Sequence, residues 1–457
     1  MENSLMDSVD YKDQYVCVVG LGYVGLTLAA AMADVGFNVL GVEIRDDVLS
    51  LLDKGKPHFH EPGLEDRLKQ VISSGTLTFS KDIPSGWNGA VFIITVGTPL
   101  DNNGNSRLDM IERVSRQVAQ NLKDDDLVIM RSTVKIGSTR KIVMPILNEA
   151  KCKYELAFCP ERTLEGKALI ELRSLPQIVG GLTYGASVRA SQLFQHLTPT
   201  VVKVEDVETA EMIKLIDNAQ RDVAFAYANE VAQACDAVGI SAAEVIRAGK
   251  LGYARTNLPM PGPVGGPCLE KDSYILAESL REMGVEPSIT MSARNLNEKQ
   301  PDDIIKYLRK ITSSFVGFPD NPKITLMGIA FKGQPETNDL RGTMAKPILN
   351  ALKEIFSNAS FFGYDAIVED SEIRNFGLEP LFTLEQAFNE ANLVLIINNH
   401  PAFITMSVNV LAEKMAQPGL IYDFWNCFNA SDLHLPVGTG YMALGSHGRA
   451  KLPEEGI

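Results

Sequence analysis

A glycine-rich hexapeptide constrains the fold of this chain more than any other feature. GLGYVG at residues 20–25 directly follows the apolar run YVCVV and precedes the helical stretch LTLAAAMADVG. This strand–GxGxxG–helix order is typical of a unit that binds a dinucleotide, because the glycines allow a tight turn and a close approach to a pyrophosphate. The start of the helix offers unpaired N–H groups to the phosphates. We therefore expect a cofactor-binding turn here, with a purely structural glycine turn as the alternative.

The residue expected to select the cofactor is Glu43, at the end of the next apolar stretch. An acid about 20 residues after the glycine turn binds the ribose hydroxyls of NAD and repels the 2′-phosphate of NADP. Arg45 lies two residues further on and would accept that phosphate. We expect NAD, and Arg45 keeps NADP open as the alternative.

The rest of the chain alternates apolar strands with helical stretches. The expected strands are YVCVVG, NVLGVEI, AVFIITVG, LVIMRSTV, LAFCPE and QIVGG, followed by a second set, KITLMGIAFKG, FFGYD, LVLIINNH and LIYDFWN. Between the two sets, residues 206–240 are rich in alanine and lack proline, with glycine only at Gly239, which predicts one long helix. The predicted fold class is α/β, with two Rossmann-like doubly wound domains joined by a long central helix.

Composition argues against several classes of partner. A chain of 457 residues needs more than one core, and 45% hydrophobic with 22% charged residues is typical of a soluble globular protein. A net charge of −14 argues against nucleic acid or an anionic membrane as the main partner. Six irregularly spaced cysteines form neither a disulfide framework nor a CxxC metal pair, so we expect a reducing, cytoplasmic setting and no metal. The longest apolar runs are too short for a membrane span.

One cysteine, Cys268, lies in a segment suited to chemistry, GPVGGPCLEKD. The two glycines before it let the backbone pass close to a ligand. Pro267 suits the first turn of a helix, and a cysteine at a helix N-terminus is favoured as the thiolate. Asp272 would then share a helical face with Cys268. The spacing predicts a nucleophile beside a carboxylate and the ammonium of Lys271, with a buried, inert cysteine as the alternative.

Six motifs occur in one order along the chain: GLGYVG, VGTPL, RSTV, CPERTLEGKA, EMIKLIDNAQRDVAFAYANE and GPVGGPCLEKD. Together they resemble the UDP-glucose/GDP-mannose dehydrogenase family over roughly residues 15–430. Members of this family are nucleotide-sugar 6-dehydrogenases, which oxidise the C6 alcohol of the sugar to a carboxylate with NAD⁺ used twice. The resemblance implies an aldehyde-level intermediate held as a thiohemiacetal on the cysteine, then a thioester that water hydrolyses.

The resemblance also implies catalytic roles. Cys268 would be the nucleophile, and Lys214 would stabilise the developing oxyanion at C6, with Asn218 as its partner on the same helix. Asp272 would activate water. The remaining catalytic assignments are Glu161, as a base that positions the hydrolytic water, and Thr133, beside the nicotinamide. Along the helix, the spacing places four polar residues on one stripe, for which a solvated helix face is the alternative: Glu211, Lys214, Asn218 and Arg221.

Two sets of binding residues follow from the resemblance. The expected cofactor-binding residues are Gly20, Gly22, Tyr23, Val24, Gly25, Glu43, Thr98, Thr133, Glu165 and Arg341. The expected substrate-binding residues are Glu161, Arg162, Lys214, Asn218, Arg255, Gly265 and Lys332. The basic members would meet the phosphates by focusing positive potential inside an acidic protein.

The expected domain order begins with an N-terminal extension over 1–14 and a NAD-binding Rossmann domain over 15–200. A central helical dimerisation domain over 201–300, a C-terminal nucleotide-sugar-binding domain over 301–445 and a tail over 446–457 complete it. We expect a homodimer or a higher homo-oligomer. CPER and the ARTN…PGPVGG segment favour a UDP-N-acetylhexosamine as substrate, oxidised for surface polysaccharide precursor synthesis, whereas LEKD after the cysteine keeps UDP-glucose open.

Two other classes of function remain as alternatives. An ordinary two-electron dehydrogenase would also combine a Rossmann domain with a long helix, but it has no need of a thiol nucleophile. A non-catalytic sensor of NAD or a nucleotide sugar would have no use for a reactive thiolate.

Overall fold

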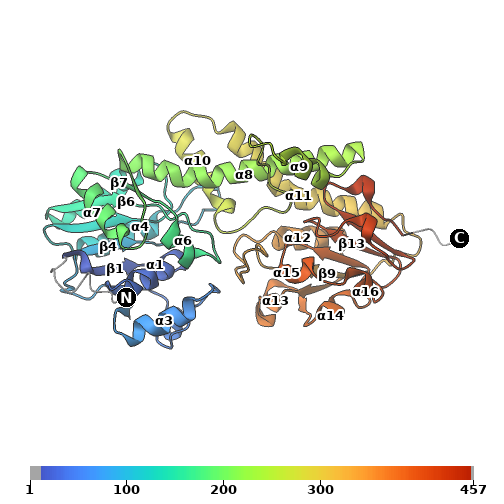
Figure 1. Cartoon of the computed structure of the whole chain (residues 1–457), viewed down its shortest axis with the longest axis horizontal. Helices are drawn as coiled ribbons and strands as arrows, with labels where there is room; N and C mark the ends of the chain where they lie inside the picture. The colour runs from blue at the N-terminus through green and yellow to red at the C-terminus, as the bar shows by residue number, and fades with distance from the viewer. Residues whose placement is uncertain (1–11, 454–457) are drawn as a thin grey trace. The chain divides into compact units, whose positions relative to one another are not determined.

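Two sheets of the same topology build this chain. The computed structural model describes residues 12–453. Within them, an eight-stranded sheet has the order β3-β2-β1-β4-β5-β6-β7-β8, and a six-stranded sheet has the order β11-β10-β9-β12-β13-β14. Only β6 and β7 pair antiparallel among these strands. The prediction of two Rossmann-like α/β domains and a long central helix is confirmed (Figure 1).

The chain divides into two compact units. The first unit takes the residues up to Asp217 together with Tyr274–Glu286, and the second takes Asn218–Ser273 together with the residues from Pro287 onward. The division crosses two helices, α8 (Val207–Val238) and α10 (Leu269–Glu282).

The first sheet is parallel except for the β6–β7 pair, and helices cover both of its faces. Its strands are β1 (Tyr15–Val19), β2 (Asn38–Val42), β3 (Leu77–Ser80), β4 (Val91–Ile94), β5 (Asp126–Met130), β6 (Tyr154–Phe158), β7 (Gln177–Gly181) and β8 (Val201–Val204). Its helices are α1 (Tyr23–Asp34), α2 (Asp46–Leu52), α3 (Leu64–Ser73), α4 (Asp109–Ala119), α5 (Met144–Leu147), α6 (Ala168–Ser174) and α7 (Tyr184–Gln195), with a π-helical turn at Thr139–Val143.

Strand β1 shows why helices cover both faces. Its side chains alternate between two cores, because Val16 and Val18 pack with α1 and α7, whereas Cys17 and Val19 pack with α4 on the opposite face. All four are buried, as expected for a central parallel strand. The glycine turn that follows β1 is therefore held on a rigid scaffold.

The second sheet has its own pair of cores. Its strands are β9 (Lys323–Met327), β10 (Ser360–Tyr364), β11 (Glu379–Pro380), β12 (Leu393–Ile396), β13 (Gly419–Asp423) and β14 (Thr439–Ala443). Helices α11 (Ser288–Thr312) and α12 (Ala345–Ile355) pack on one face, and α14 (Leu384–Phe388), α15 (Pro401–Ile404) and α16 (Val408–Ala412) pack on the other. Helices α9 (Ala242–Lys250) and α13 (Asp370–Phe376) complete this unit.

The long helix predicted over residues 206–240 is present as α8. Four strands were not expected, namely β3, β8, β11 and β14. Three of them, β3, β8 and β11, are short and have one buried position at most, so they carry little of the apolar signal that marks a buried strand.

Three local expectations need correction or fall outside the described residues. Strand β9 ends at Met327 and does not extend through the whole expected segment KITLMGIAFKG, because Gly328 has φ +89° and leaves the extended conformation. The segment after Ser446, expected as a tail, is folded up to residue 453, since Lys451 pairs with Tyr441. Most of the expected extension over 1–14 falls outside the described residues.

Candidate functional site

The glycine turn after β1 folds as its sequence predicts. Gly20 has φ +95°, and its N–H donates to the Val42 carbonyl at 2.8 Å. A Cβ on Gly25 would lie 1.9 Å from the carbonyl oxygen of Gly20, so helix α1 can approach the turn only with glycine there. A Cβ on Gly22 would meet no protein atom within 4 Å. The surface beside Gly22 is therefore open to a ligand.

Glu43 closes this turn from the end of β2. Its side chain is buried, and its Oε2 accepts the Leu21 N–H at 3.2 Å. Its Oε1 accepts the N–H and the Nε–H of Arg45 at 3.1 and 3.2 Å. Glu43, which favoured NAD in the sequence, and Arg45, which kept NADP open, thus form an ion pair, and the arginine is half-exposed.

Two residues expected near the cofactor lie in contact. The hydroxyl of Thr98, which is buried, donates to the carbonyl of Thr133 at 2.6 Å. Sequence reasoning missed Thr95, which follows β4 and whose hydroxyl donates to the Gly20 carbonyl at 2.7 Å. Strand β4 lies next to β1 where the strand order reverses, the usual place for a ligand in such sheets. That position could have identified Thr95.

Tyr23 links the glycine turn to the CPERTLEGKA loop. Its hydroxyl donates to Glu61 and accepts the Gly166 N–H at 3.0 Å, and Glu61 accepts the same N–H at 2.7 Å. Burial, followed by the neighbouring Glu61 carboxylate, raises the pKa of Tyr23 well above its usual value. The predicted residue Glu165 directly precedes Gly166. The sequence offers little signal for Glu61, which lies in a loop rich in proline and histidine.

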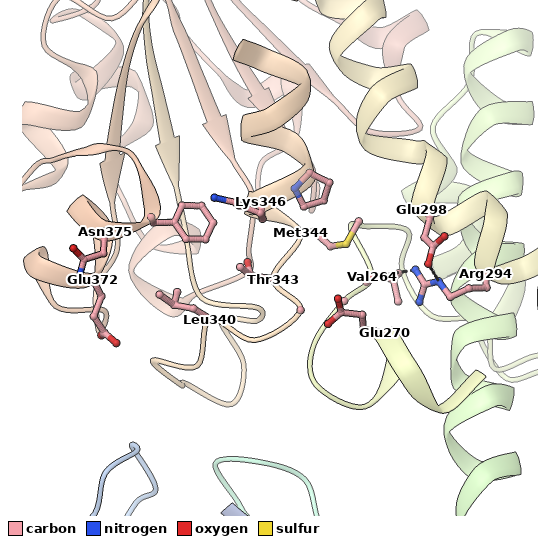
Figure 2. A pocket seen from close by; sticks show the side chains of 14 residues that line it. Val264, Glu270, Arg294, Glu298, Leu340, Thr343, Met344, Lys346, Glu372 and Asn375 are labelled. Carbon is pink, nitrogen blue, oxygen red and sulfur yellow. Dashed lines mark hydrogen bonds and ion pairs between the residues drawn. The ribbon is translucent and has the colours of Figure 1, made fainter. Parts of the chain in front are cut away.

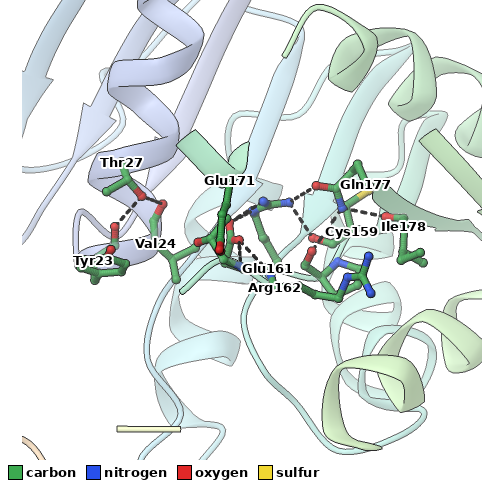
Figure 3. Close-up of polar contacts among 12 residues, drawn as sticks. Tyr23, Val24, Thr27, Cys159, Glu161, Arg162, Glu171, Gln177 and Ile178 are labelled. Atoms are coloured by element: carbon green, nitrogen blue, oxygen red, sulfur yellow. Dashed lines mark hydrogen bonds and ion pairs between the residues drawn. The ribbon is translucent and has the colours of Figure 1, made fainter. Parts of the chain in front are cut away.

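Glu161 is fully engaged by protein groups (Figure 3). Its Oε2 pairs with the buried Arg131, at 3.1 Å from Nε, and its Oε1 accepts the N–H groups of Arg162 and Thr163 at 2.8 and 2.7 Å. Burial alone would raise the pKa of Glu161, but the Arg131 guanidinium and the Thr163 N–H hold it below its usual value. An ionised, saturated carboxylate is a weak base, so this geometry favours a structural role.

Cys268 lies at the start of a helix, as predicted. Helix α10 begins at Leu269, and the Cys268 carbonyl accepts the Asp272 N–H at 2.9 Å, which makes Cys268 the capping residue. Pro267 consequently precedes the helix rather than forming its first turn. The cysteine is exposed, unlike Cys17 and Cys159, which are buried. The burial expected under the alternative of an inert cysteine is therefore wrong, whereas the reactivity of Cys268 stays a prediction.

A polar cluster forms around Asp272 in the turn after the cysteine. Asp272 is fully buried, and its Oδ2 accepts the Asn218 side-chain N–H at 2.6 Å. Its Oδ1 pairs with the Lys271 ammonium at 2.9 Å. The structure therefore brings together Asn218 from α8 and Asp272 from α10, two residues that were assigned catalytic roles.

The two glycines before Cys268 allow close packing against another loop of the second unit. A Cβ on Gly265 would lie 2.1 Å from the Gly342 carbonyl oxygen, and a Cβ on Gly266 would lie 2.5 Å from the Phe331 ring. The Gly266 N–H also donates to the Gly342 carbonyl at 2.7 Å. The glycines thus let the loop pack against protein, namely the loop between β9 and α12, and the substrate-binding role expected of Gly265 stays a prediction.

The stripe on α8 is solvated only in part. Glu211 is buried and accepts the Thr139 N–H at 2.8 Å, and Asn218 is buried as described above. Lys214 is half-buried and belongs to the first unit, whereas Arg221 is exposed. The polar residues of this stripe at Glu211 and Asn218 therefore have defined protein partners.

The expected phosphate-binding residues lie on loops. Arg255 is exposed with its guanidinium 5.3 Å from the Tyr253 ring, and the Lys332 ammonium is 5.2 Å from the Phe331 ring. Arg341 is exposed and pairs with Asp339 at 2.6 Å. In the first unit, Arg162 donates to the Pro176 carbonyl at 2.8 Å. The roles assigned to these residues stay predictions.

This chain belongs to the UDP-glucose/GDP-mannose dehydrogenase family. The NAD binding domain of the family matches residues 14–198, the central domain matches residues 208–299, and the UDP binding domain matches residues 325–430. The family expected from the six motifs is confirmed. The chain is accordingly a NAD-dependent nucleotide-sugar dehydrogenase with a UDP-binding domain.

Several relatives match nearly the whole chain. The UDP-N-acetyl-D-mannosamine dehydrogenase of Campylobacter jejuni is 32% identical over 409 residues, covering 85% of this chain and 96% of the relative. The NDP-N-acetyl-D-galactosaminuronic acid dehydrogenase of Ralstonia nicotianae is 29% identical, with 89% and 96% covered. A solved UDP-D-ManNAc dehydrogenase from Pyrococcus horikoshii is 29% identical with a TM-score of 0.83, covering 95% of this chain and 100% of that one.

The geometry of the glycine turn in the first unit is suited to binding NAD. Helix α1 begins after Gly22 without a side-chain cap, which leaves its first N–H groups to a pyrophosphate beside the open surface of Gly22. Glu43 stands at the ribose position after β2. Between residues 12 and 453, no helix is long and apolar enough to cross a membrane, and no cluster of His, Cys, Asp and Glu suits a metal ion.

Proposed function

We propose that this chain oxidises the C6 hydroxyl of a UDP-N-acetylhexosamine to the uronic acid, through a covalent intermediate on Cys268. The observation that carries the proposal is the exposed sulfur at the N-terminus of α10, one helical turn before a buried Asp272 that Asn218 holds in place. A thiolate there is both a strong nucleophile and a good leaving group. Relatives named for UDP-N-acetyl-D-mannosamine favour this substrate class over UDP-glucose.

Bound NAD⁺ supplies the hydride acceptor for both oxidations. Gly20, Gly22 and Gly25 with Glu43 would hold it, and Thr98 fixes the carbonyl of Thr133, which would line the nicotinamide side. These residues orient a ligand without exchanging protons with it. Their part is to place the hydride acceptor, and the bond-making chemistry belongs to the second unit.

Cys268 converts the aldehyde into a species that can be oxidised again. Its thiolate adds to the aldehyde carbon, so a C–S bond forms while the carbonyl π pair moves to oxygen and takes a proton as the thiohemiacetal. Transfer of hydride from this carbon to the NAD⁺ acceptor, with release of the hydroxyl proton, would leave a thioester. Water would then add to the thioester carbon, the C–S bond would break, and the electron pair would return to sulfur as the thiolate while the carboxylate and two protons leave.

The neighbouring polar residues would manage charge during these steps. Lys214 would stabilise the oxyanion on C6, because an ammonium acts strongly where charge develops out of water. Asp272 would accept a proton from the attacking water, with Asn218 and Lys271 orienting its two oxygens. Glu161 is assigned no proton here, because Arg131 and backbone N–H groups occupy its carboxylate.

The test is stoichiometry with a panel of UDP- and GDP-sugars. The proposal expects two NADH per sugar and a uronic acid product, with the highest kcat/KM for a UDP-N-acetylhexosamine. One NADH per sugar would establish an ordinary two-electron dehydrogenase instead. Ligand binding without any NADH formation would favour the sensor.

We also propose that the enzyme works as a homo-oligomer and supplies surface polysaccharide precursors. In the second unit, α8 and the segment after it expose apolar side chains at Tyr227, Val238, Val245 and Leu251. Exposed apolar side chains that gather on a surface mark interaction sites. Light scattering coupled to size exclusion should give at least a dimer mass, and a monomer at micromolar concentration would contradict the proposed assembly.

A further inference from the structure

The second half of the loop that carries Cys268 is held by buried polar side chains. Residues 254–268 form no helix or strand. In the middle of this loop, the side chain of Asn229 on α8 bonds both backbone groups of Gly262, accepting its N–H at 2.9 Å and donating to its carbonyl at 3.1 Å. The ring of Trp425 fills the space beside Gly262, where a Cβ would lie 3.0 Å from it. The path of the chain is thus set six residues before the cysteine.

Arg294 on α11 spans the remainder of the loop. It is 2% exposed, and its NH1 donates to the Leu269 carbonyl at 3.0 Å while its NH2 donates to the Val264 carbonyl at 3.3 Å. These two carbonyls lie on either side of Cys268 in the chain. Because a guanidinium is planar and rigid, it fixes the separation of the two groups that it bridges.

Asp222 on α8 holds this arginine in place. It is 1% exposed, and its Oδ1 accepts from Arg294 at 3.0 Å and from Asn297 at 2.8 Å. Its Oδ2 accepts the Ser273 hydroxyl at 3.0 Å, and Ser273 directly follows Asp272. Since a buried ion pair adds little net stability, a geometric role explains this network better than a contribution to folding.

Packing alone does not hold the loop. Val264, Gly265 and Glu270 line a cavity of about 690 Å³ together with Arg294 and residues of α12 and α13 (Figure 2). On the cavity side, Arg294 pairs with Glu298 at 3.2 Å, so the guanidinium stands between the loop and open space. Hydrogen bonds from Arg294 therefore replace the side-chain contacts that would otherwise fix the loop on this side.

We infer that Arg294, anchored by Asp222, is a positioning residue that fixes Cys268 at the N-terminus of α10. The inference rests on the proposed function only in that the cysteine is the nucleophile. Arg294 touches neither substrate nor cofactor in this account, and it acts through the carbonyls of Val264 and Leu269. None of the sequence motifs pointed to it, because Asp222, Val264 and Leu269 are 25 to 72 residues away from it in the chain.

The test compares Arg294→Lys with Arg309→Lys, the same change at an exposed position of the same helix. The rate at which iodoacetamide alkylates Cys268 in the absence of substrates, measured by mass spectrometry of the peptide that contains it, reports on the local environment of the sulfur. Because the sulfur is already exposed, freeing the loop should slow alkylation by about two- to fivefold, the size of a helix-terminus effect on a charge. The Arg309 variant should react like the parent.

Turnover gives the second readout. In the Arg294→Lys variant kcat should fall roughly 10²-fold, because a small displacement of a reacting group has an effect of this size. The change in KM should be smaller. Hydrogen exchange of residues 262–269 should also become faster. A folded Arg294→Lys enzyme with parental alkylation rate and kcat would overturn the inference.

Two further variants keep the inference testable if Arg294→Lys does not fold. Asp222→Asn keeps the shape of the anchor without its charge, and Ser273→Ala removes one of its bonds. Both variants should slow the alkylation of Cys268, and Asp222→Asn should slow it more than Ser273→Ala. Parental alkylation rates in both variants would overturn the inference. Full uronic acid formation by Cys268→Ser would instead refute the proposed function, while the alkylation and exchange results would still report on the loop.

Discussion

The two sheets share one strand order yet differ in the turn that follows their first strand. In the first unit, Gly20 turns the chain and α1 begins at Tyr23. In the second unit, Gly328 makes the corresponding turn with φ +89°, and its N–H donates to Tyr364 as that of Gly20 donates to Val42. Helix α12, however, does not begin until Ala345. A long loop takes the place of the helix N-terminus.

The acids at the ends of β2 and β10 make the contrast sharper. Asp365 accepts four backbone N–H groups, from Ile329 and Ala330 in the turn and from Ile367 and Val368 in its own loop. Glu43 accepts only the Leu21 N–H from its turn, and its other oxygen holds Arg45. The comparison teaches that strand order alone does not make a dinucleotide site. A helix N-terminus next to the glycine turn is also required.

The largest expected effects come from adding one methyl group to each turn region. Gly25→Ala places a Cβ 1.9 Å from the Gly20 carbonyl oxygen, and Gly333→Ala places one 2.0 Å from the His400 nitrogen. Calorimetric titration should show that Gly25→Ala loses NAD binding by 10²-fold or more but keeps UDP binding, and that Gly333→Ala does the reverse. These magnitudes are rough, since rigid backbone must move in both variants.

Gly22→Ala is the matched control for this comparison. Its Cβ meets no protein atom within 4 Å, so the variant should melt at the parental temperature and lose NAD affinity alone. Parental NAD affinity in Gly22→Ala would show that the pyrophosphate lies elsewhere.

The two buried acids on α8 should differ in how strongly pH affects them. Burial raises the pKa of Asp222, but its partner Arg294 opposes this rise. Glu211 is held by the neutral groups of Gly137 and Thr139, and burial raises its pKa from 4.5 to about 7. Because the folded state favours protonated Glu211, its contribution to the free energy of unfolding is complete below pH 4.5 and is lost as the pH rises to about 7. The loss should be roughly 3 kcal/mol.

Urea unfolding at several pH values, compared with Glu211→Gln, measures this effect. The glutamine variant should lack the pH-dependent loss between pH 4.5 and 7. Identical pH profiles for the two proteins would show that Glu211 is ionised in the folded enzyme throughout this range.

The smallest effects should follow neutralisation of the two strand-end acids. Glu43→Gln should lower the affinity for NAD about tenfold and reduce the preference for NAD over NADP, because the side chain that binds the ribose loses its charge. Asp365→Asn should instead lower the free energy of unfolding by about 1–2 kcal/mol and leave NAD affinity unchanged. A loss of NAD affinity in Asp365→Asn would undo the distinction between the two acids.

Local chemistry explains which features could be predicted from the sequence. The glycine turn, the long helix α8 and the helix start at Cys268 follow from neighbouring residues, because turns, helices and caps are local structures. Glu43 followed from its spacing along the chain. Arg131, Glu61 and Asp222 could not be found this way, since each is defined by partners brought near only by the fold.

Gly265 and Gly266 also show that contacts between distant parts of the chain cannot be predicted from local sequence. Their presence predicted a close approach, which is present, but not what approaches them. Gly342 and Phe331 lie more than 60 residues further along the chain, and only the second unit's fold brings them against the loop. Short or exposed edge strands such as β8 were likewise invisible, because their pairing partners rather than their own residues define them.

Acid quenching during turnover tests the central claim most directly. The enzyme is mixed with NAD⁺ and its UDP-sugar and is denatured within a fraction of the turnover time. After digestion, mass spectrometry gives the mass of the peptide that contains Cys268. The account predicts that this peptide gains the mass of the acyl form of the nucleotide sugar, and that Cys268→Ser gains none. An unmodified peptide at every quench time, while two NADH form per sugar, would contradict covalent catalysis by Cys268.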